Sequence, residues 1–315
     1  MTDPVTGPGP TGPVVPKDVA VRRGTARRHQ HDDHVEIAYE TLGPRDGTPL
    51  LLIAGTGEQR YLWPEAFCIA LVDRGFQVTR FDNRDTGAST RFDDAGPPSQ
   101  LRMWLRPTAA ARYTLQDMAE DALAVIDAQG WDRAHVAGAS MCGMIAQVLA
   151  RSHPERVRTM TSISSTPAPR IGLPRPRTLL RLWKVAKEPV ADPAAMARQL
   201  IAIAGIVGSP AFPVDTELLT RIARESFPLR NDLAAHQRHT AAITASGDRR
   251  RELRELRVPT LVLHGDADPM IRPSAGRATA HAVPGARLRT FPGMGHDLPR
   301  ALWDDIADEI ASTTR

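Results

Sequence analysis

Cysteine is scarce in this sequence, with only Cys68 and Cys142 among 315 residues. Two thiols so far apart support neither a disulfide framework nor a zinc site, which takes about four ligands. We therefore expect a reducing, cytoplasmic setting and no bound metal.

Long apolar runs are also missing. The run over residues 49–54 is far shorter than the roughly 20 apolar residues that a membrane span needs, so we expect no transmembrane helix. Residues 1–16 lack the apolar segment of a secretory signal and carry Asp3 near their start. Their repeated proline and glycine predict a disordered tail over residues 1–18.

Lysine is rare, at positions 17, 184 and 187, so arginine supplies most of the net charge of +4. The basic residues are mostly scattered, and the run 249–251 is followed by Glu252 and Glu255, as on a solvated helix face. This pattern argues against a nucleic-acid partner. Hydrophobic residues make up 42% and charged residues 24%, which is typical of a globular protein with one sizeable core.

Strand-like and helix-like patterns alternate along most of the chain. Apolar alternation or short buried runs predict strands at residues 35–41, 50–54, 76–81, 134–137, 157–163, 258–264 and 287–291. Helical spacing predicts helices at residues 64–74, 115–129, 144–150 and 298–311. Such alternation indicates an α/β fold, a mostly parallel sheet flanked by helices.

The alternation stops between residues 166 and 254, where proline- and arginine-rich segments and helical patterns occur without a convincing strand. We interpret residues 166–254 as a helical cap inserted into a core made of residues 19–165 and 255–315. The cap enters after one predicted strand and leaves just before the next. It should therefore lie over the carboxyl edge of the sheet and line a substrate pocket.

The segment from Gly138 to Gly143 reads Gly-Ala-Ser-Met-Cys-Gly and lies between a predicted strand and a predicted helix. In that context a Gly-x-Ser-x-Gly pattern is a nucleophile elbow, a strained turn that presents the serine hydroxyl. Ser140 is the candidate nucleophile. Cys142 stands where glycine is usual, which leaves open how closely the helix packs on the strand, and whether Cys142 itself is a nucleophile.

A serine hydroxyl needs a base to take its proton and a carboxylate to orient that base. Asp268 and His296 each follow directly after a predicted strand and so belong to the same sheet edge as Ser140. We predict that His296 is the base and Asp268 the acid. Asp266 is the competing carboxylate, with a possible role in capping the turn.

The developing oxyanion needs preorganised N–H donors. Met141 follows the nucleophile and opens a helix, so its amide is one candidate. Thr56, between Gly55 and Gly57 in the loop after the strand at 50–54, is the other.

Over residues 35–311 the chain resembles the α/β-hydrolase fold family, in which Ser, Asp and His follow one another in this order. The loop Asp82–Ser89, which reads Asp-Asn-Arg-Asp-Thr-Gly-Ala-Ser, and the elbow segment resemble a branch that includes aclacinomycin methylesterase. The resemblance implies hydrolysis of a small-molecule carboxylic ester, with the methyl ester of a bulky natural product as one candidate. It implies no cofactor.

Other functions stay open at this point. A thioesterase, a carbon–carbon bond hydrolase or a cofactor-free haloperoxidase would keep the same three residues, and a non-catalytic binding protein could retain the fold. Ser140 argues against the dehalogenases and epoxide hydrolases of this fold, which use a carboxylate nucleophile. The sequence predicts no oligomeric state.

Overall fold

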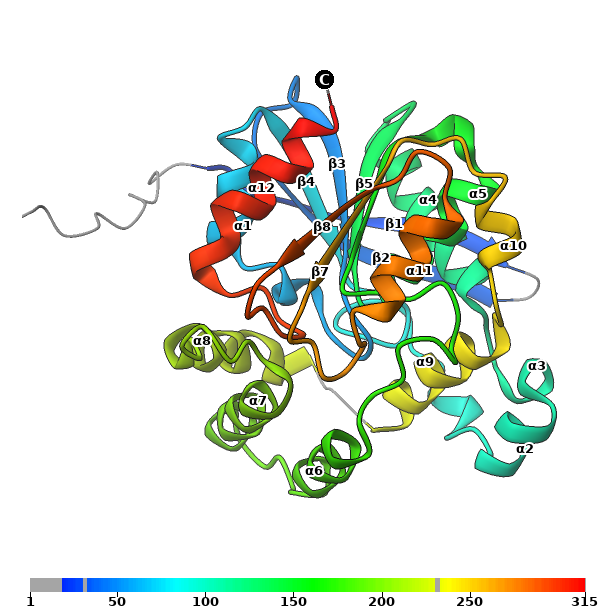
Figure 1. The fold of residues 1–315 in the computed structure, drawn as a ribbon, viewed down its shortest axis with the longest axis vertical. Coiled ribbons are helices and arrows are strands. Elements are labelled where there is room, and N and C mark those ends of the chain that lie inside the picture. The colour runs from blue at the N-terminus through cyan, green and yellow to red at the C-terminus, as the bar shows by residue number, and fades with distance from the viewer. Residues whose placement is uncertain (1–18, 31–32, 230–232, 315) are drawn as a thin grey trace, which may run out of the picture.

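In a computed structural model that describes residues 19–30, 33–229 and 233–314, the chain folds around one eight-stranded sheet (Figure 1). The predicted tail over residues 1–18 lies outside the described residues. The strands are β1 Arg22–Gln30, β2 Asp33–Leu42, β3 Thr48–Ile53, β4 Phe76–Phe81, β5 Ala134–Ala139, β6 Val157–Ile163, β7 Thr260–Gly265 and β8 Arg287–Phe291. Their order is β1-β2-β4-β3-β5-β6-β7-β8, antiparallel at β1–β2 and β2–β4 and parallel elsewhere. The predicted mostly parallel sheet is confirmed.

Strand β1 was missed by the sequence patterns. It is an edge strand that pairs only with β2, and its sequence Arg-Arg-Gly-Thr-Ala-Arg-Arg-His-Gln has almost no apolar alternation. Ala26 is its one residue in the apolar core among the described residues, and cross-strand ion pairs join Arg23 to Glu40 and Arg27 to Glu36. An edge strand held in this way carries no hydrophobic period to detect.

Helices cover both faces of the sheet (Figure 1). On one face lie α1 Glu65–Val72 and α12 Trp303–Ser312, which pack with β3, β4 and β7 around Trp63, Phe67 and Trp303. On the other face lie α4 Leu115–Ala128, α5 Met141–Ser152 and α11 Ser274–Ala282. Helix α4 begins with a capping box, in which Thr114 and Asp117 bind each other's backbone N–H groups. The two apolar clusters hold the strands in place from both sides.

Among the described residues, five α-helices are inserted between β6 and β7, and the first four of them lie at the lower end of Figure 1. They are α6 Pro176–Ala186, α7 Pro193–Val207, α8 Thr216–Ser226, α9 Leu233–Ala245 and α10 Arg250–Leu253. The described part of residues 166–254 contains no strand. Two short helices that the patterns did not predict, α2 Gln100–Leu105 and α3 Pro107–Ala110, contact α9. No helix in the described ranges is long and apolar enough to cross a membrane.

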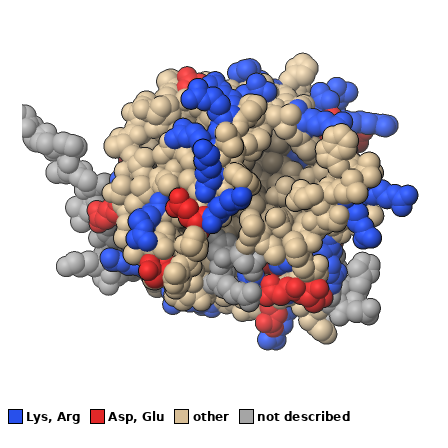
Figure 2. All heavy atoms as spheres, turned by 90° about the horizontal axis from the view of Figure 1, so that it is seen from below, with Lys and Arg blue, Asp and Glu red and all other residues tan. Residues whose placement is uncertain are grey.

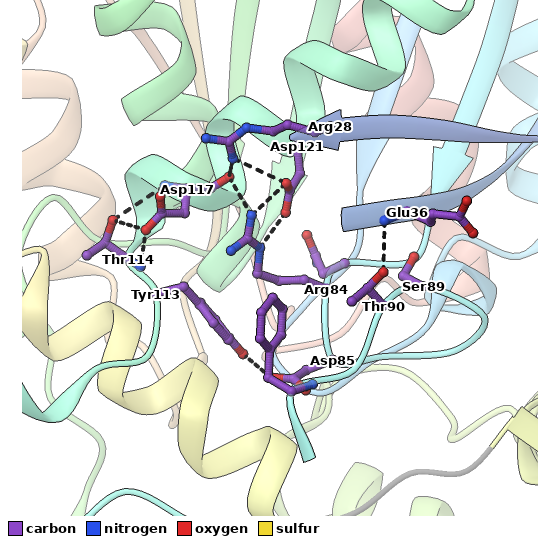
Figure 3. Close-up of polar contacts among 12 residues, drawn as sticks. Arg28, Glu36, Arg84, Asp85, Ser89, Thr90, Tyr113, Thr114, Asp117 and Asp121 are labelled. Atoms are coloured by element: carbon purple, nitrogen blue, oxygen red, sulfur yellow. Dashed lines mark hydrogen bonds and ion pairs between the residues drawn. The ribbon is translucent and has the colours of Figure 1, made fainter. Parts of the chain in front are cut away.

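Residues 82–90, which follow β4 and are called the Asp82 loop below, are fixed by buried charges (Figure 3). Arg84 makes hydrogen bonds of 2.6 and 2.7 Å to the two carboxylate oxygens of Asp121 on α4. Asp85 accepts two hydrogen bonds of 2.7 Å from Arg238 on α9 and one of 2.6 Å from the Tyr113 hydroxyl. Because charges without partners are costly in a protein interior, each of these contacts constrains two parts of the chain at once.

We expect the Arg84→Ala variant to lose about 3–5 kcal/mol of unfolding free energy, because it leaves the Asp121 carboxylate buried without its main partner. Urea unfolding followed by circular dichroism measures the loss. Arg27→Ala, which removes an exposed pair with Glu36, is the matched control and should cost less than about 1 kcal/mol. Equal losses in the two variants would contradict the structural importance of the buried pair.

Candidate active site

Ser140 occupies a strained turn between β5, which ends at Ala139, and α5, which begins at Met141. Its φ of 57° and ψ of −124° are rarely adopted by residues with a side chain. Glycines permit the turn on both sides. A Cβ at position 138 would lie 2.1 Å from the carbonyl oxygen of Cys142, and one at position 143 would lie 2.6 Å from Cβ of Ser165. The local geometry is therefore that of a nucleophile elbow.

Cys142 is accommodated in this turn because only its backbone lies against Gly138, while its side chain is buried elsewhere. Its sulfur lies against the carbonyl oxygen of Ala54, at the end of β3, and 3.3 Å from Nδ2 of Asn83 in the Asp82 loop. Burial raises the pKa of the Cys142 thiol well above its usual value. A buried, protonated thiol is a poor nucleophile, so the geometry favours Ser140.

The structure brings Ser140, His296 and Asp268 together from three loops at one edge of the sheet. His296 Nδ1 lies 2.7 Å from Oδ2 of Asp268, and His296 Nε2 lies 3.1 Å from Oγ of Ser140. Because the carboxylate can only accept, Nδ1 carries the proton, and Nε2 is free to accept the serine proton. Burial lowers the pKa of His296, but the charge and hydrogen bond of Asp268 and the charge of Glu58 outweigh it, and the net shift is upward.

Asp268 and Asp266 have different partners. Asp268 is buried, and its second oxygen, Oδ1, accepts hydrogen bonds of 2.8 and 2.9 Å from the amides of Met270 and Ile271. Asp266 is exposed and accepts a hydrogen bond of 2.7 Å from the amide of Gly293. This bond holds the turn before His296 in place. Asp268 is therefore the carboxylate in contact with the histidine.

Thr56 and Met141 follow two neighbouring strands, β3 and β5, at equivalent positions. Ile53 of β3 pairs with Gly138 of β5, so Thr56 and Met141 each lie three residues beyond a paired position. Neither backbone amide has a hydrogen-bond acceptor within the described part of the chain. Both amides are therefore candidates for the N–H donors that an oxyanion requires.

The loop that carries Thr56 is supported by His239 of α9, a residue that sequence reasoning missed. The amide of Gly57 donates to Nδ1 of His239 at 2.9 Å, and Nε2 of His239 in turn donates to the carbonyl oxygen of Arg84 at 2.9 Å. Burial lowers the pKa of His239 to about 4, so the ring is neutral and can accept from Gly57. The sequence signal was weak, because a histidine within a helical pattern has many possible roles.

Glu58 is a second residue that the patterns did not identify. Its carboxyl lies over Gly55, where a Cβ would come within 2.0 Å of Oε2, and its charge acts on His296. The side chain is open to solvent, but the surrounding protein weakens its hydration and raises the pKa of Glu58 to about 7, against the lowering influence of His296. Its place two residues after Thr56 was the one signal in the sequence.

Among the described residues, no three or more His, Cys, Asp and Glu side chains are grouped so that they could hold a metal ion.

Comparisons with known proteins identify the fold family of the chain. The model of the α/β hydrolase fold family matches residues 48–299. Rhodomycin D methylesterase of Streptomyces peucetius is 29% identical over 308 residues, which cover 90% of this chain and 96% of that protein. The crystal structure of a hydrolase from Pseudomonas aeruginosa PA01 has a TM-score of 0.65 at 26% identity, covering 92% of this chain and 97% of the other. That of the enol-lactonase from Burkholderia xenovorans LB400 has a TM-score of 0.67 at 23% identity, with coverages of 89% and 96%. The chain belongs to the α/β-hydrolase fold family.

Proposed function

We propose that this protein is a serine hydrolase that cleaves a carboxylic ester through an acyl-enzyme intermediate. The observation that carries the proposal is the continuous hydrogen-bonded series from Ser140 through His296 to Asp268. The strained turn at Ser140 and the two unpaired amides beside it support the same reaction.

In the proposed mechanism, Oγ of Ser140 attacks the ester carbonyl carbon while Nε2 of His296 takes the hydroxyl proton. The amides of Thr56 and Met141 stabilise the oxyanion of the tetrahedral intermediate. The intermediate collapses, the ester C–O bond breaks, and the leaving alcohol receives the proton from His296. Water then attacks the acyl-enzyme by the same route, which releases the carboxylic acid and restores Ser140.

The similarity to rhodomycin D methylesterase favours a methyl ester on a bulky molecule as the substrate class. We further propose that residues 166–254 form a cap that selects the substrate. The half-buried side chains of Ile203, Ile206 and Phe212 in this segment are candidates for the apolar wall of a pocket. A thioesterase, a carbon–carbon bond hydrolase or a cofactor-free haloperoxidase would use the same three residues. A panel of methyl, short-acyl and long-acyl esters and thioesters separates ester from thioester cleavage.

Replacing the nucleophile tests the proposed function directly. We expect Ser140→Ala to lower kcat by about 10⁴–10⁶, because the attacking oxygen is lost. The variant should also resist labelling by a fluorophosphonate and should keep the wild-type melting temperature. Retention of more than about a tenth of the wild-type rate would refute Ser140 as the nucleophile.

The two carboxylates can be distinguished by conservative substitution. We expect Asp268→Asn to lower kcat by about 10⁴, because the amide cannot hold His296 in the required tautomer. Asp266→Asn keeps an oxygen that can accept from Gly293, so its kcat should stay within about tenfold of wild type. Steady-state kinetics on one soluble ester measure both, and the reverse ranking would show that Asp266 is the acid.

Activity should fall on acidification, because protonated His296 cannot accept the serine proton. Since the pKa of His296 is raised, the rate should begin to fall above the ordinary titration range of histidine. Glu58→Gln removes a negative charge that stabilises the imidazolium, so its acid limb should lie at lower pH than that of wild type. In wild type the acid limb of the pH profile reports the joint titration of His296 and Glu58. In Glu58→Gln it reports the titration of His296 alone.

Profiles of kcat/KM between about pH 5 and 9 measure this shift. Glu155→Gln, at an exposed position outside the site, is the matched control and should leave the limb where it is. A limb that moves equally in both variants, or in neither, would refute the influence of Glu58 on the base.

A further inference from the structure

Large apolar side chains are exposed on two helices at the end of the molecule where the inserted helices lie (Figure 1). Among the described residues, eleven large hydrophobic side chains are exposed, and six of them belong to α2 and α6. They are Leu101, Trp104, Leu105, Leu179, Leu180 and Trp183. Trp104 is the extreme case, with 88% of its surface open. Single exposed apolar residues are ordinary, but grouping on two helices marks an interaction surface.

The same two segments carry positive charge and no negative charge. Residues 97–112 contain three arginines, residues 166–187 contain six basic residues, and neither segment contains Asp or Glu. The exposed ones on and next to the two helices are Arg102, Arg106, Arg175, Arg177, Arg181, Lys184 and Lys187. None of these seven forms an ion pair with a described acidic residue. Their charge is therefore available to an outside partner.

Helix α6 arranges its residues as an interfacial helix does. Thr178, Leu182 and Val185 follow helical spacing and are buried or half-buried, so they face the protein. The opposite side presents a stripe of Leu179, Leu180 and Trp183 with basic residues beside it, and the Lys187 ammonium lies 3.4 Å from the centre of the Trp183 ring. Aromatic and aliphatic side chains bordered by Lys and Arg suit the boundary between lipid headgroups and acyl chains.

Figure 2 looks at this end of the molecule and shows Lys and Arg side chains, with fewer Asp and Glu side chains among them, around a broad, hollowed surface of uncharged residues. Helices α2 and α6 are separate elements that both lie at this end (Figure 1). We propose that their exposed sides, together called the basic apolar face below, bind the surface of an anionic lipid bilayer. The leucines and tryptophans enter the headgroup region, and the basic residues contact the anionic headgroups. This binding does not depend on the proposed ester chemistry.

Charge favours a bilayer over two other partners. In a symmetric dimer the same patch meets its own copy, so two basic faces without acidic residues would repel each other. Nucleic acid would satisfy the arginines, but it offers nothing to the exposed leucines. An anionic bilayer satisfies both, because each basic residue near its surface and each apolar side chain in its interface contributes to binding.

Vesicle flotation of the full chain tests the proposal. We expect binding to phosphatidylcholine vesicles that contain about a third phosphatidylglycerol, with much weaker binding to phosphatidylcholine alone. Binding should fall in about 1 M NaCl, where the Debye length is about 3 Å. Tryptophan fluorescence should shift to shorter wavelength on the anionic vesicles, because Trp104 and Trp183 leave water.

Matched variants locate the surface. Arg177→Gln/Arg181→Gln should weaken vesicle binding about tenfold or more, and Leu101→Ser/Leu105→Ser should also weaken it. Arg133→Gln/Arg158→Gln removes the same charge from exposed positions at the opposite edge of the sheet, and Leu288→Ser removes an exposed leucine from β8. These two controls should bind as wild type does, and all four variants should keep the wild-type circular dichroism.

Three outcomes would overturn the proposal. The first is no binding of the wild-type chain to anionic vesicles. The second is equal weakening by Arg177→Gln/Arg181→Gln and by its charge-matched control. The third is a dimer in sedimentation experiments that Leu101→Ser/Leu105→Ser dissociates while vesicle binding is unaffected, which would assign the face to a second copy of the chain.

Discussion

The buried carboxylate of Asp85 joins the inserted helix α9 to the loop that follows β4. Burial alone would raise its pKa, but hydrogen bonds from Arg238, the Phe92 amide and Tyr113 lower it, so the group is held as an anion. A buried anion needs those donors in place, and Arg238 belongs to α9. The inserted helix is thus fixed to the core by charge. This contact brings the next residue, His239, to the amide of Gly57 and so supports the loop of Thr56.

Strain at Ser140 is tolerated because the surrounding chain determines the turn from several directions. The Ser140 amide donates to the carbonyl of Ile163 at 2.9 Å, and the Ser165 hydroxyl donates to the Ser140 carbonyl at 2.7 Å. Together with the glycines at 138 and 143, these bonds leave the backbone few alternatives. A turn fixed in advance lets the hydroxyl face His296 without reorganisation during the reaction.

The sequence was informative wherever one strong local rule applied. The buried strand β3 was predicted from a short apolar run, and the meeting of Ser140, Asp268 and His296 followed from their positions after strands of one parallel sheet. It was uninformative where tertiary contacts decide the outcome. Strand β1 is stabilised by cross-strand ion pairs, and His239 and Glu58 acquire their surroundings only when distant segments meet. Local patterns in a single sequence do not predict such contacts between distant segments.

The inserted helices differ in how far their sequences can change without disturbing the proposed chemistry. Helix α9 buries Arg238 and His239, which contact the Asp82 loop and the loop of Thr56, so substitution there would disturb both loops. Helix α6 buries only Thr178 and presents most of its residues to solvent. Within the proposed cap, α9 therefore contacts two loops of the candidate site, whereas most residues of α6 face solvent. Substitutions in α6 should disturb those two loops less than substitutions in α9.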